Sequence, residues 1–194
     1  MKLLITSANT DLAQQLASSL STDHQIRLTD VVDCQTDFDF YRSALDHESQ
    51  LPVQHIDSIV HLAKLPPTSI ALNGITDIAN QRLDFSTRCT YNLLKASVEN
   101  GVSNFVFIST LGLFNKLGKN VAIGPRWRPR PTTDPDLLAS YLGECICREF
   151  AREGLIKITI LRLGQVHIRA IASAVSEAII NKKNWQIIHL ERQK

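Results

Sequence analysis

Short apolar runs alternate with longer segments of helical period along most of this chain. The runs that we assign to strands lie at 2–6, 25–29, 58–62, 104–109, 157–163 and 185–190. An alternation of this kind is expected of a parallel sheet whose two faces are both covered by helices. The pattern therefore predicts an α/β protein with a doubly wound, mainly parallel sheet of about seven strands.

Between these runs, apolar residues recur at the spacing of an amphipathic helix, as Leu12, Leu16 and Leu20 do. The pattern as a whole predicts about six helices, placed on both faces of the sheet. The stretch before residue 58 is rich in loop signals, and 112–133 is predicted as a loop. The clearest helices span 11–20, 75–100 with Gly101 as C-cap, Pro135 to near Gly154, and 170–181.

The length of 194 residues suffices for one well-buried core and is too short for a second full domain. The net charge of +2 gives no support to a nucleic-acid binder or a membrane-surface binder. The four cysteines and six histidines show no metal-ligand spacing, so no metal site is predicted. No apolar stretch approaches the ~20 residues of a membrane span, and the N-terminus lacks a signal-peptide pattern. We expect a cytoplasmic protein with reduced thiols.

Five segments stand out along the chain: KLLITSANTDLA at 2–13, DSIVHLA at 57–63, TYNLLKASVENGVSNFVFIS at 90–109, Tyr141 within SYLGEC, and ILRLGQV at 160–166. In this order they resemble the extended short-chain dehydrogenase/reductase family, the NAD-dependent epimerase/dehydratase group. The resemblance implies a single Rossmann-type NAD(P)-binding domain over 1–194, acting on a nucleotide sugar or a similar carbonyl or hydroxyl substrate. It also implies a homodimer formed through the helices at 75–100 and 134–153.

The resemblance places the cofactor's pyrophosphate at the turn after the first strand, where a helix N-terminus binds phosphate. Ser7, Thr10 and Ala13 stand where the family has three glycines. Ala13 suits helix packing, and Ser7 is compatible with the turn if its φ stays negative. Thr10 brings a β-branched side chain to the point of closest approach, and the carboxylate of Asp11 would repel a phosphate. On a second interpretation these residues only cap a structural helix.

Asp30 ends the second strand, about 20 residues after Thr10, at the position of the family's acidic residue. An acidic residue there accepts hydrogen bonds from the adenosine ribose and disfavours a 2′-phosphate, so NAD is favoured over NADP. An aspartate at a strand end is also common in ordinary turns. NAD is therefore the candidate cofactor, and its candidate binding residues are Ser7, Thr10, Asp11, Leu12, Asp30, Leu62 and Ala63.

The family's hydride transfer uses a Ser/Thr hydroxyl, a tyrosine as acid/base, and a lysine four residues after the tyrosine. Thr110, with Ser109 beside it, matches the hydroxyl position, and Tyr141 matches the tyrosine. Cys145 takes the lysine position, and a neutral thiol supplies no positive charge to favour the phenolate. Ser86 stands where the family commonly has an asparagine. The other interpretation of Tyr141 is that it packs on the apolar stripe of its helix.

The segment RWRPRP at 126–131 is the most unusual stretch of the chain. Three arginines around Trp127, stiffened by prolines, could clamp an anionic ligand such as a nucleotide-sugar diphosphate. Alternatively, Trp127 covers the sheet edge and the arginines pair with surface acids. The sequence alone does not decide between these two interpretations.

Two functions follow from these observations. The working assignment, on the weight of the resemblance, is an NAD(P)-dependent epimerase/dehydratase-like or reductase-like enzyme. The other is a catalytically inactive Rossmann module that serves as a ligand-binding or protein-interaction subunit. The second is motivated by Cys145 and by the few residues after 157–163, which leave the family's C-terminal substrate lobe largely absent.

Overall fold

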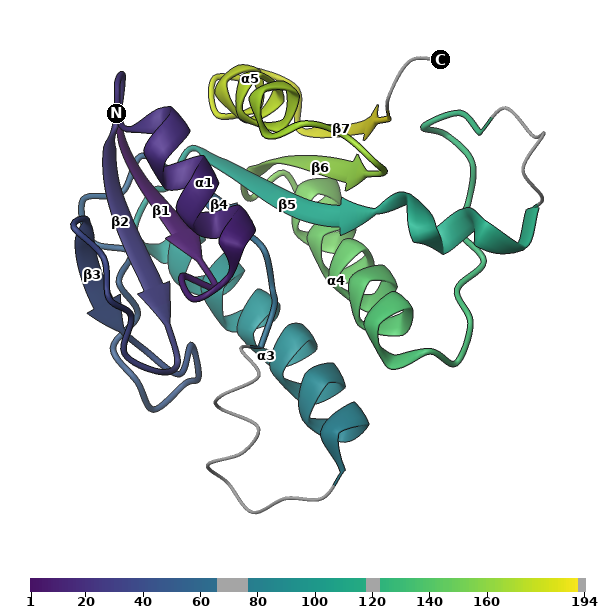
Figure 1. The fold of residues 1–194 in the computed structure, drawn as a ribbon, viewed down its shortest axis with the longest axis horizontal. Coiled ribbons are helices and arrows are strands. Elements are labelled where there is room, and N and C mark those ends of the chain that lie inside the picture. The colour runs from purple at the N-terminus through teal and green to yellow at the C-terminus, as the bar shows by residue number, and fades with distance from the viewer. Residues whose placement is uncertain (66–76, 118–122, 192–194) are drawn as a thin grey trace.

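A computed structural model of the chain describes residues 1–65, 77–117 and 123–191. Its seven strands form one sheet in which every neighbouring pair is parallel (Figure 1). The order across the sheet is β3-β2-β1-β4-β5-β6-β7, so the direction in which successive strands are added to the sheet reverses between β1 and β4. This confirms the predicted doubly wound, Rossmann-type α/β fold. The strands are β1 (Lys2–Thr6), β2 (Gln25–Asp30), β3 (Asp39–Arg42), β4 (Ser58–His61), β5 (Asn104–Thr110), β6 (Lys157–Leu163) and β7 (Trp185–Leu190).

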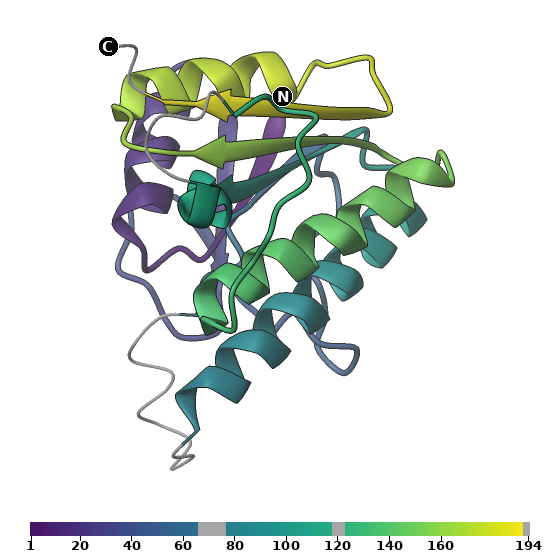
Figure 2. The same ribbon diagram turned by 90° about the vertical axis from the view of Figure 1, so that its right-hand side faces the viewer.

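Helices cover both faces of this sheet. In one layer α1 (Asp11–Leu20) and α5 (Ile168–Ala178) pack on β1, β2 and the middle strands. In the other layer α3 (Ile78–Glu99) and α4 (Pro135–Arg152) lie side by side, as Figure 2 shows. The described ranges contain these four α-helices and one 3-10 helix, η1 (Leu111–Leu117), where the sequence predicts about six helices.

Two elements depart from the sequence prediction. Strand β3 lies in the stretch predicted to be rich in loops, and η1 lies in the predicted loop 112–133. As an edge strand, β3 pairs only with β2 and is mostly exposed, so it has no apolar run to mark it. Its hydrogen bonding to β2, and not the pattern of its own residues, makes this segment a strand.

The β6–α5–β7 connection has an unusual hand. The chain steps in the same direction across the sheet from β5 to β6 and from β6 to β7, yet α4 and α5 lie on opposite faces. The two crossovers therefore have opposite hands, whereas almost all such connections are right-handed. As a result, no described helix follows α4 along its own layer to cover β7.

Close packing fixes the position of α4. A Cβ atom added at Gly143 would collide with the ring of Phe107 on β5, so the helix backbone lies against this ring. The position of α4 in turn determines the positions of Tyr141 and Glu144, which lie on the same helix. Within the described residues, no helix is long and apolar enough to cross a membrane.

Candidate functional site

The turn after β1 is held in a conformation that usually requires glycine. Ser7 has a φ of +61°, in the left-handed region, which differs from the negative φ expected of it. Its Oγ accepts a hydrogen bond of 2.9 Å from the amide of Lys64. Ala63, two residues after β4, also has a positive φ of +53°. These two neighbouring backbone positions each cost about 1–2 kcal/mol relative to a right-handed residue.

Thr10 caps the start of α1. Its Oγ1 accepts from the amide of Ala13 at 3.3 Å and donates to the carbonyl of Ser7 at 2.8 Å. The amides of Asp11 and Leu12, the first two residues of α1, have no acceptor among the described residues. Free amides at a helix N-terminus favour a bound anion. The start of α1 therefore keeps the donors that a phosphate needs, although the glycines of the family are replaced.

Asp30 is buried, with 2% of its surface exposed, and its carboxylate is already occupied. One oxygen accepts from the backbone amide and the side-chain amide of Asn9, at 2.8 and 3.2 Å. The other accepts from the amide of Val31 at 2.7 Å. Burial raises the pKa of Asp30, and the hydrogen bonds from Asn9 and Val31 act in the opposite direction. Asn9 therefore covers the acceptor that a ribose would need.

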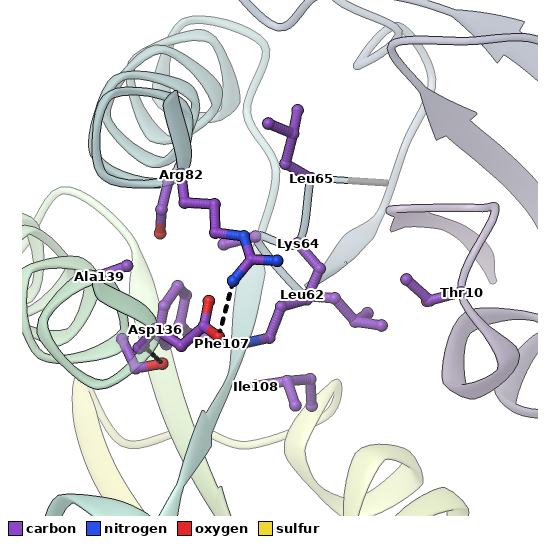
Figure 3. Close-up of a pocket in the computed structure, with 12 residues that line it drawn as sticks. Thr10, Leu62, Lys64, Leu65, Arg82, Phe107, Ile108, Asp136 and Ala139 are labelled. Atoms are coloured by element: carbon purple, nitrogen blue, oxygen red, sulfur yellow. Dashed lines mark hydrogen bonds and ion pairs between the residues drawn. The ribbon is translucent and has the colours of Figure 1, made fainter. Parts of the chain in front are cut away.

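A pocket of about 250 Å³ opens at the carboxyl edge of the sheet, between α3, α4 and the loops after β1 and β4 (Figure 3). We call it the crevice pocket. An ion pair of 3.1 Å between Arg82 and Asp136 joins α3 to α4 in its wall. Open α/β sheets bind ligands at this edge. Its lining includes Thr10, Leu62, Ala63, Lys64, Arg82, Ser86, Ile108 and Ser140.

Tyr141 does not line the crevice pocket. It lines a second pocket, together with Cys145 and the loop at 125–129. The side chain of Cys145, by its charge when ionised and by its hydrogen bond to the phenol, raises the pKa of Tyr141. Burial adds to the rise, and the more distant guanidinium groups of Arg148 and Arg128 oppose it. The tyrosine is therefore held in its protonated form at neutral pH.

The two hydroxyl groups after β5 are engaged in local structure. Thr110 accepts from the amide of Gly112 at 3.0 Å through its Oγ1, which closes the turn into η1. Ser109 is buried and donates to Glu144 at 2.6 Å. The structure thus brings Ser109 to α4, but to Glu144 rather than to Tyr141.

Glu144 and Arg162 form a buried ion pair that sequence analysis missed. The guanidinium group donates from Nε and Nη2 to the two carboxylate oxygens at 2.9 and 2.7 Å. Its Nη1 lies 3.3 Å from Nε2 of His189, and the group packs over the ring of Phe114. The available signal was a lone arginine inside the apolar strand KITILRL, since a charge buried in a strand needs a partner.

Comparison with family models finds no match, and neither does comparison with curated protein sequences. Solved structures match over the whole chain. A UDP-N-acetylglucosamine 4-epimerase from Methanobrevibacter ruminantium, in complex with UDP-N-acetylmuramic acid, has a TM-score of 0.82 at 13% identity, with 100% of this chain and 77% of that chain covered. A mutated uronate dehydrogenase has a TM-score of 0.80 at 18% identity, covering 97% and 73%.

The chain shares its Rossmann-type fold with these two enzymes. MoeE5, in complex with UDP-glucuronic acid and NAD, has the same fold at a TM-score of 0.80 and 16% identity, with 100% of this chain and 77% of that chain covered. The fold therefore agrees with the resemblance seen in the sequence. The described residues contain no group of three or more His, Cys, Asp or Glu side chains that could hold a metal ion.

Proposed function

We propose that this chain is a non-catalytic Rossmann module that binds an NAD-type nucleotide at the crevice pocket without transferring a hydride. One observation carries the proposal. Tyr141, the candidate acid/base residue, lines a different pocket from Thr10 and the other crevice residues. The tyrosine is therefore not grouped with the residues that would hold the cofactor. The proposal treats 1–194 as one domain.

Three features support binding at the crevice. The amides of Asp11 and Leu12 offer donors to a phosphate at the start of α1. Lys64 adds positive charge to the pocket lining, whereas the charge of Arg82 is offset by its ion pair with Asp136. The pocket volume of about 250 Å³ accommodates one part of a dinucleotide, and the rest would lie along the start of α1. One solved neighbour with the same fold, MoeE5, contains NAD.

Loss of the hydride-transfer step follows from Tyr141 and Cys145. Acid/base catalysis works best when the group's pKa lies near the working pH. Here the pKa of Tyr141 moves upward, away from neutrality, because its neighbour is a thiol instead of an ammonium group. Ser109 cannot substitute, since its hydroxyl is committed to Glu144.

The proposal is tested by titrating the protein with NAD in a calorimeter and by assaying UDP-glucose and UDP-glucuronic acid for NADH formation and for epimerised product, since an epimerisation regenerates NAD. We expect binding, a higher melting temperature with NAD than without it, and no turnover. Absence of binding at millimolar NAD would remove the ligand half of the proposal. Turnover that disappears in Tyr141→Phe would remove the non-catalytic half.

Restoring glycines to the turn should strengthen NAD binding. The double variant Ser7→Gly/Thr10→Gly removes two side chains from the phosphate approach and relieves the left-handed strain at Ser7. We expect a dissociation constant about tenfold lower, equivalent to about 1.4 kcal/mol. Calorimetry measures it, with exposed Ser103→Gly as the matched control. An unchanged or weaker affinity in the double variant would mean that the nucleotide does not contact this turn.

Replacing the thiol by an ammonium group should lower the pKa of Tyr141. In Cys145→Lys, a cation one helical turn away favours the phenolate, so the pKa of Tyr141 should fall below its value in the parent. The tyrosinate absorbance is titrated in the variant, in Cys145→Met and in Cys145→Lys/Tyr141→Phe, which identifies the signal of Tyr141. Equal titration curves for the Lys and Met variants would show that the side chain at 145 does not control the phenol.

Assembly as a homodimer through α3 and α4 belongs to the same proposal. Tyr91 on α3 packs edge-on against Phe150 of α4, yet 51% of Tyr91 remains exposed at the outer side of this helix pair. Burial of this surface against a second copy would remove apolar area from water. Sedimentation equilibrium at micromolar concentration should give the dimer mass, and Tyr91→Glu should give a monomer.

A further inference from the structure

The second pocket, on the flank of α4 that faces β7, has the composition of a ligand site. Its volume is about 380 Å³, within the ~300–1,000 Å³ range of small-molecule pockets. It lies where no described helix follows α4 along its layer, and the loop at 125–129 forms its outer wall. We call it the arginine–tryptophan pocket. Both tryptophans of the chain, Trp127 and Trp185, line it.

The charge of this pocket is strongly one-sided. Four arginines line it, against one glutamate, and that glutamate already accepts two hydrogen bonds from Arg162. Arg148 pairs with exposed Glu149 at 3.4 Å. Arg126 and Arg128 pair with no carboxylate among the described residues, so the surface acids expected as their partners are not there. The two guanidinium groups are available for an anion.

The remaining lining is flat and apolar. The indoles of Trp127 and Trp185, the phenol of Tyr141 and the side chain of Ile187 face the same space. Trp127 keeps 46% of its surface exposed, although it lies beside the edge strand β7. Indole and guanidinium planes both stack on planar rings, and a ring inserted here would cover surface that now faces water.

A buried network preorganises the wall that carries Trp127. Nη1 of Arg162 donates to the carbonyl of Trp127 at 3.5 Å, and Nδ1 of His189 lies 3.2 Å from the carbonyl of Ile123. Arg162 is 98% buried and is itself fixed by Glu144. Since these hydrogen bonds hold the loop against the sheet before a ligand binds, binding loses little conformational entropy in ordering the loop.

We propose that the arginine–tryptophan pocket binds a planar ring that carries an anionic group, either a phosphate or a carboxylate. The ring lies between the indoles, and Arg126 and Arg128 hold the anion. The site is distinct from the crevice pocket, with which it shares no lining residue. It therefore stands whether or not NAD binds at the crevice.

Tryptophan fluorescence reports on this pocket alone, because the chain has no tryptophan elsewhere. The probes are uridine 5′-monophosphate, which joins a ring to a phosphate, and nicotinate, which joins a ring to a carboxylate. Uridine and inorganic phosphate supply the separate halves. We expect quenching by at least one joined probe, with an affinity at least about tenfold above that of either half. Equal, weak responses to the joined probes and their halves would overturn the proposal.

Variants locate the bound anion. Arg128→Ala and Arg126→Ala should each weaken binding of the joined probe about tenfold or more, whereas Arg169→Ala, an exposed arginine on α5, should not. Both loop variants change exposed side chains, so the fold should be retained, and circular dichroism checks this. Undiminished binding in the loop variants would place the anion elsewhere. Saturation with NAD should leave the probe affinity unchanged, and competition would merge the two sites and contradict the proposal.

Discussion

Glu144→Gln should lower the free energy of unfolding by about 3–5 kcal/mol, the usual cost of leaving one partner of a buried ion pair uncompensated. Arg162 is 2% exposed and depends on the two carboxylate oxygens for its Nε and Nη2 protons. A neutral amide cannot accept at both positions, so one donor and the full charge stay buried. Urea denaturation of the variant measures the loss.

Two controls separate the charge from the packing. In Glu144→Leu/Arg162→Met both charges are removed, and we expect a substantial part of the lost stability to return. In Glu149→Gln the affected ion pair with Arg152 is exposed, and the urea midpoint should stay where it is. A Glu144→Gln protein as stable as the parent would show that the pair contributes nothing to stability.

The same variant links stability to the second ligand site. Arg162 supports the loop through the carbonyl of Trp127, so the loss of Glu144 releases the wall of the arginine–tryptophan pocket as well. Tryptophan emission should therefore shift in Glu144→Gln even under conditions in which the protein is fully folded. We therefore expect the free energy of unfolding and ligand binding at the arginine–tryptophan pocket to depend on the same buried carboxylate, that of Glu144.

The sequence predicted the strands that have apolar runs, because strands buried on both faces of a parallel sheet consist mostly of apolar residues. It missed β3, whose order comes from pairing with β2 and not from its own pattern. It also could not predict that α5 lies on the opposite face from α4, since both segments have the same helical period. Periodicity identifies an element but does not choose its layer.

For the candidate site, the sequence indicated which residue types were missing but not what the remaining ones do. Cys145 in place of a lysine was visible as a local substitution. The engagement of Asp30 by Asn9 depends on how the turn after β1 meets the end of β2, 21 positions apart in the chain. The left-handed φ of Ser7 and Ala63 is likewise imposed by tertiary contacts. Local propensity would not choose it.

The stability of the protein should fall by about 2 kcal/mol between pH 7 and pH 5 because of His61. This histidine is fully buried at the end of β4, with Nδ1 2.8 Å from Oγ1 of Thr6 and Nε2 3.0 Å from Oγ1 of Thr90. Burial lowers its pKa to about 3, against 6.5 in the unfolded chain. The native state therefore keeps a neutral ring while the unfolded chain takes up a proton.

The sign of this effect is opposite to that of a buried acid. Below pH 6.5 His61 becomes protonated in the unfolded chain but stays neutral in the native state. Its contribution to stability is therefore fully present above this pH and is lost as the pH falls toward 3. His189, whose pKa is also lowered, adds in the same direction, whereas Asp30, whose pKa is raised, acts against it at acidic pH. The difference between the parent and a His61 variant isolates the contribution of His61.

Urea denaturation at several pH values between 5 and 7 tests this in the parent, in His61→Gln and in His47→Gln, in which an exposed histidine is replaced. His61→Gln should be less stable at neutral pH, because the amide bridges the two threonines less well, but its stability should depend far less on pH. His47→Gln should follow the parent. Parallel pH profiles for the parent and His61→Gln would mean that the pKa of His61 is the same in the folded protein as in the unfolded chain, which contradicts the prediction.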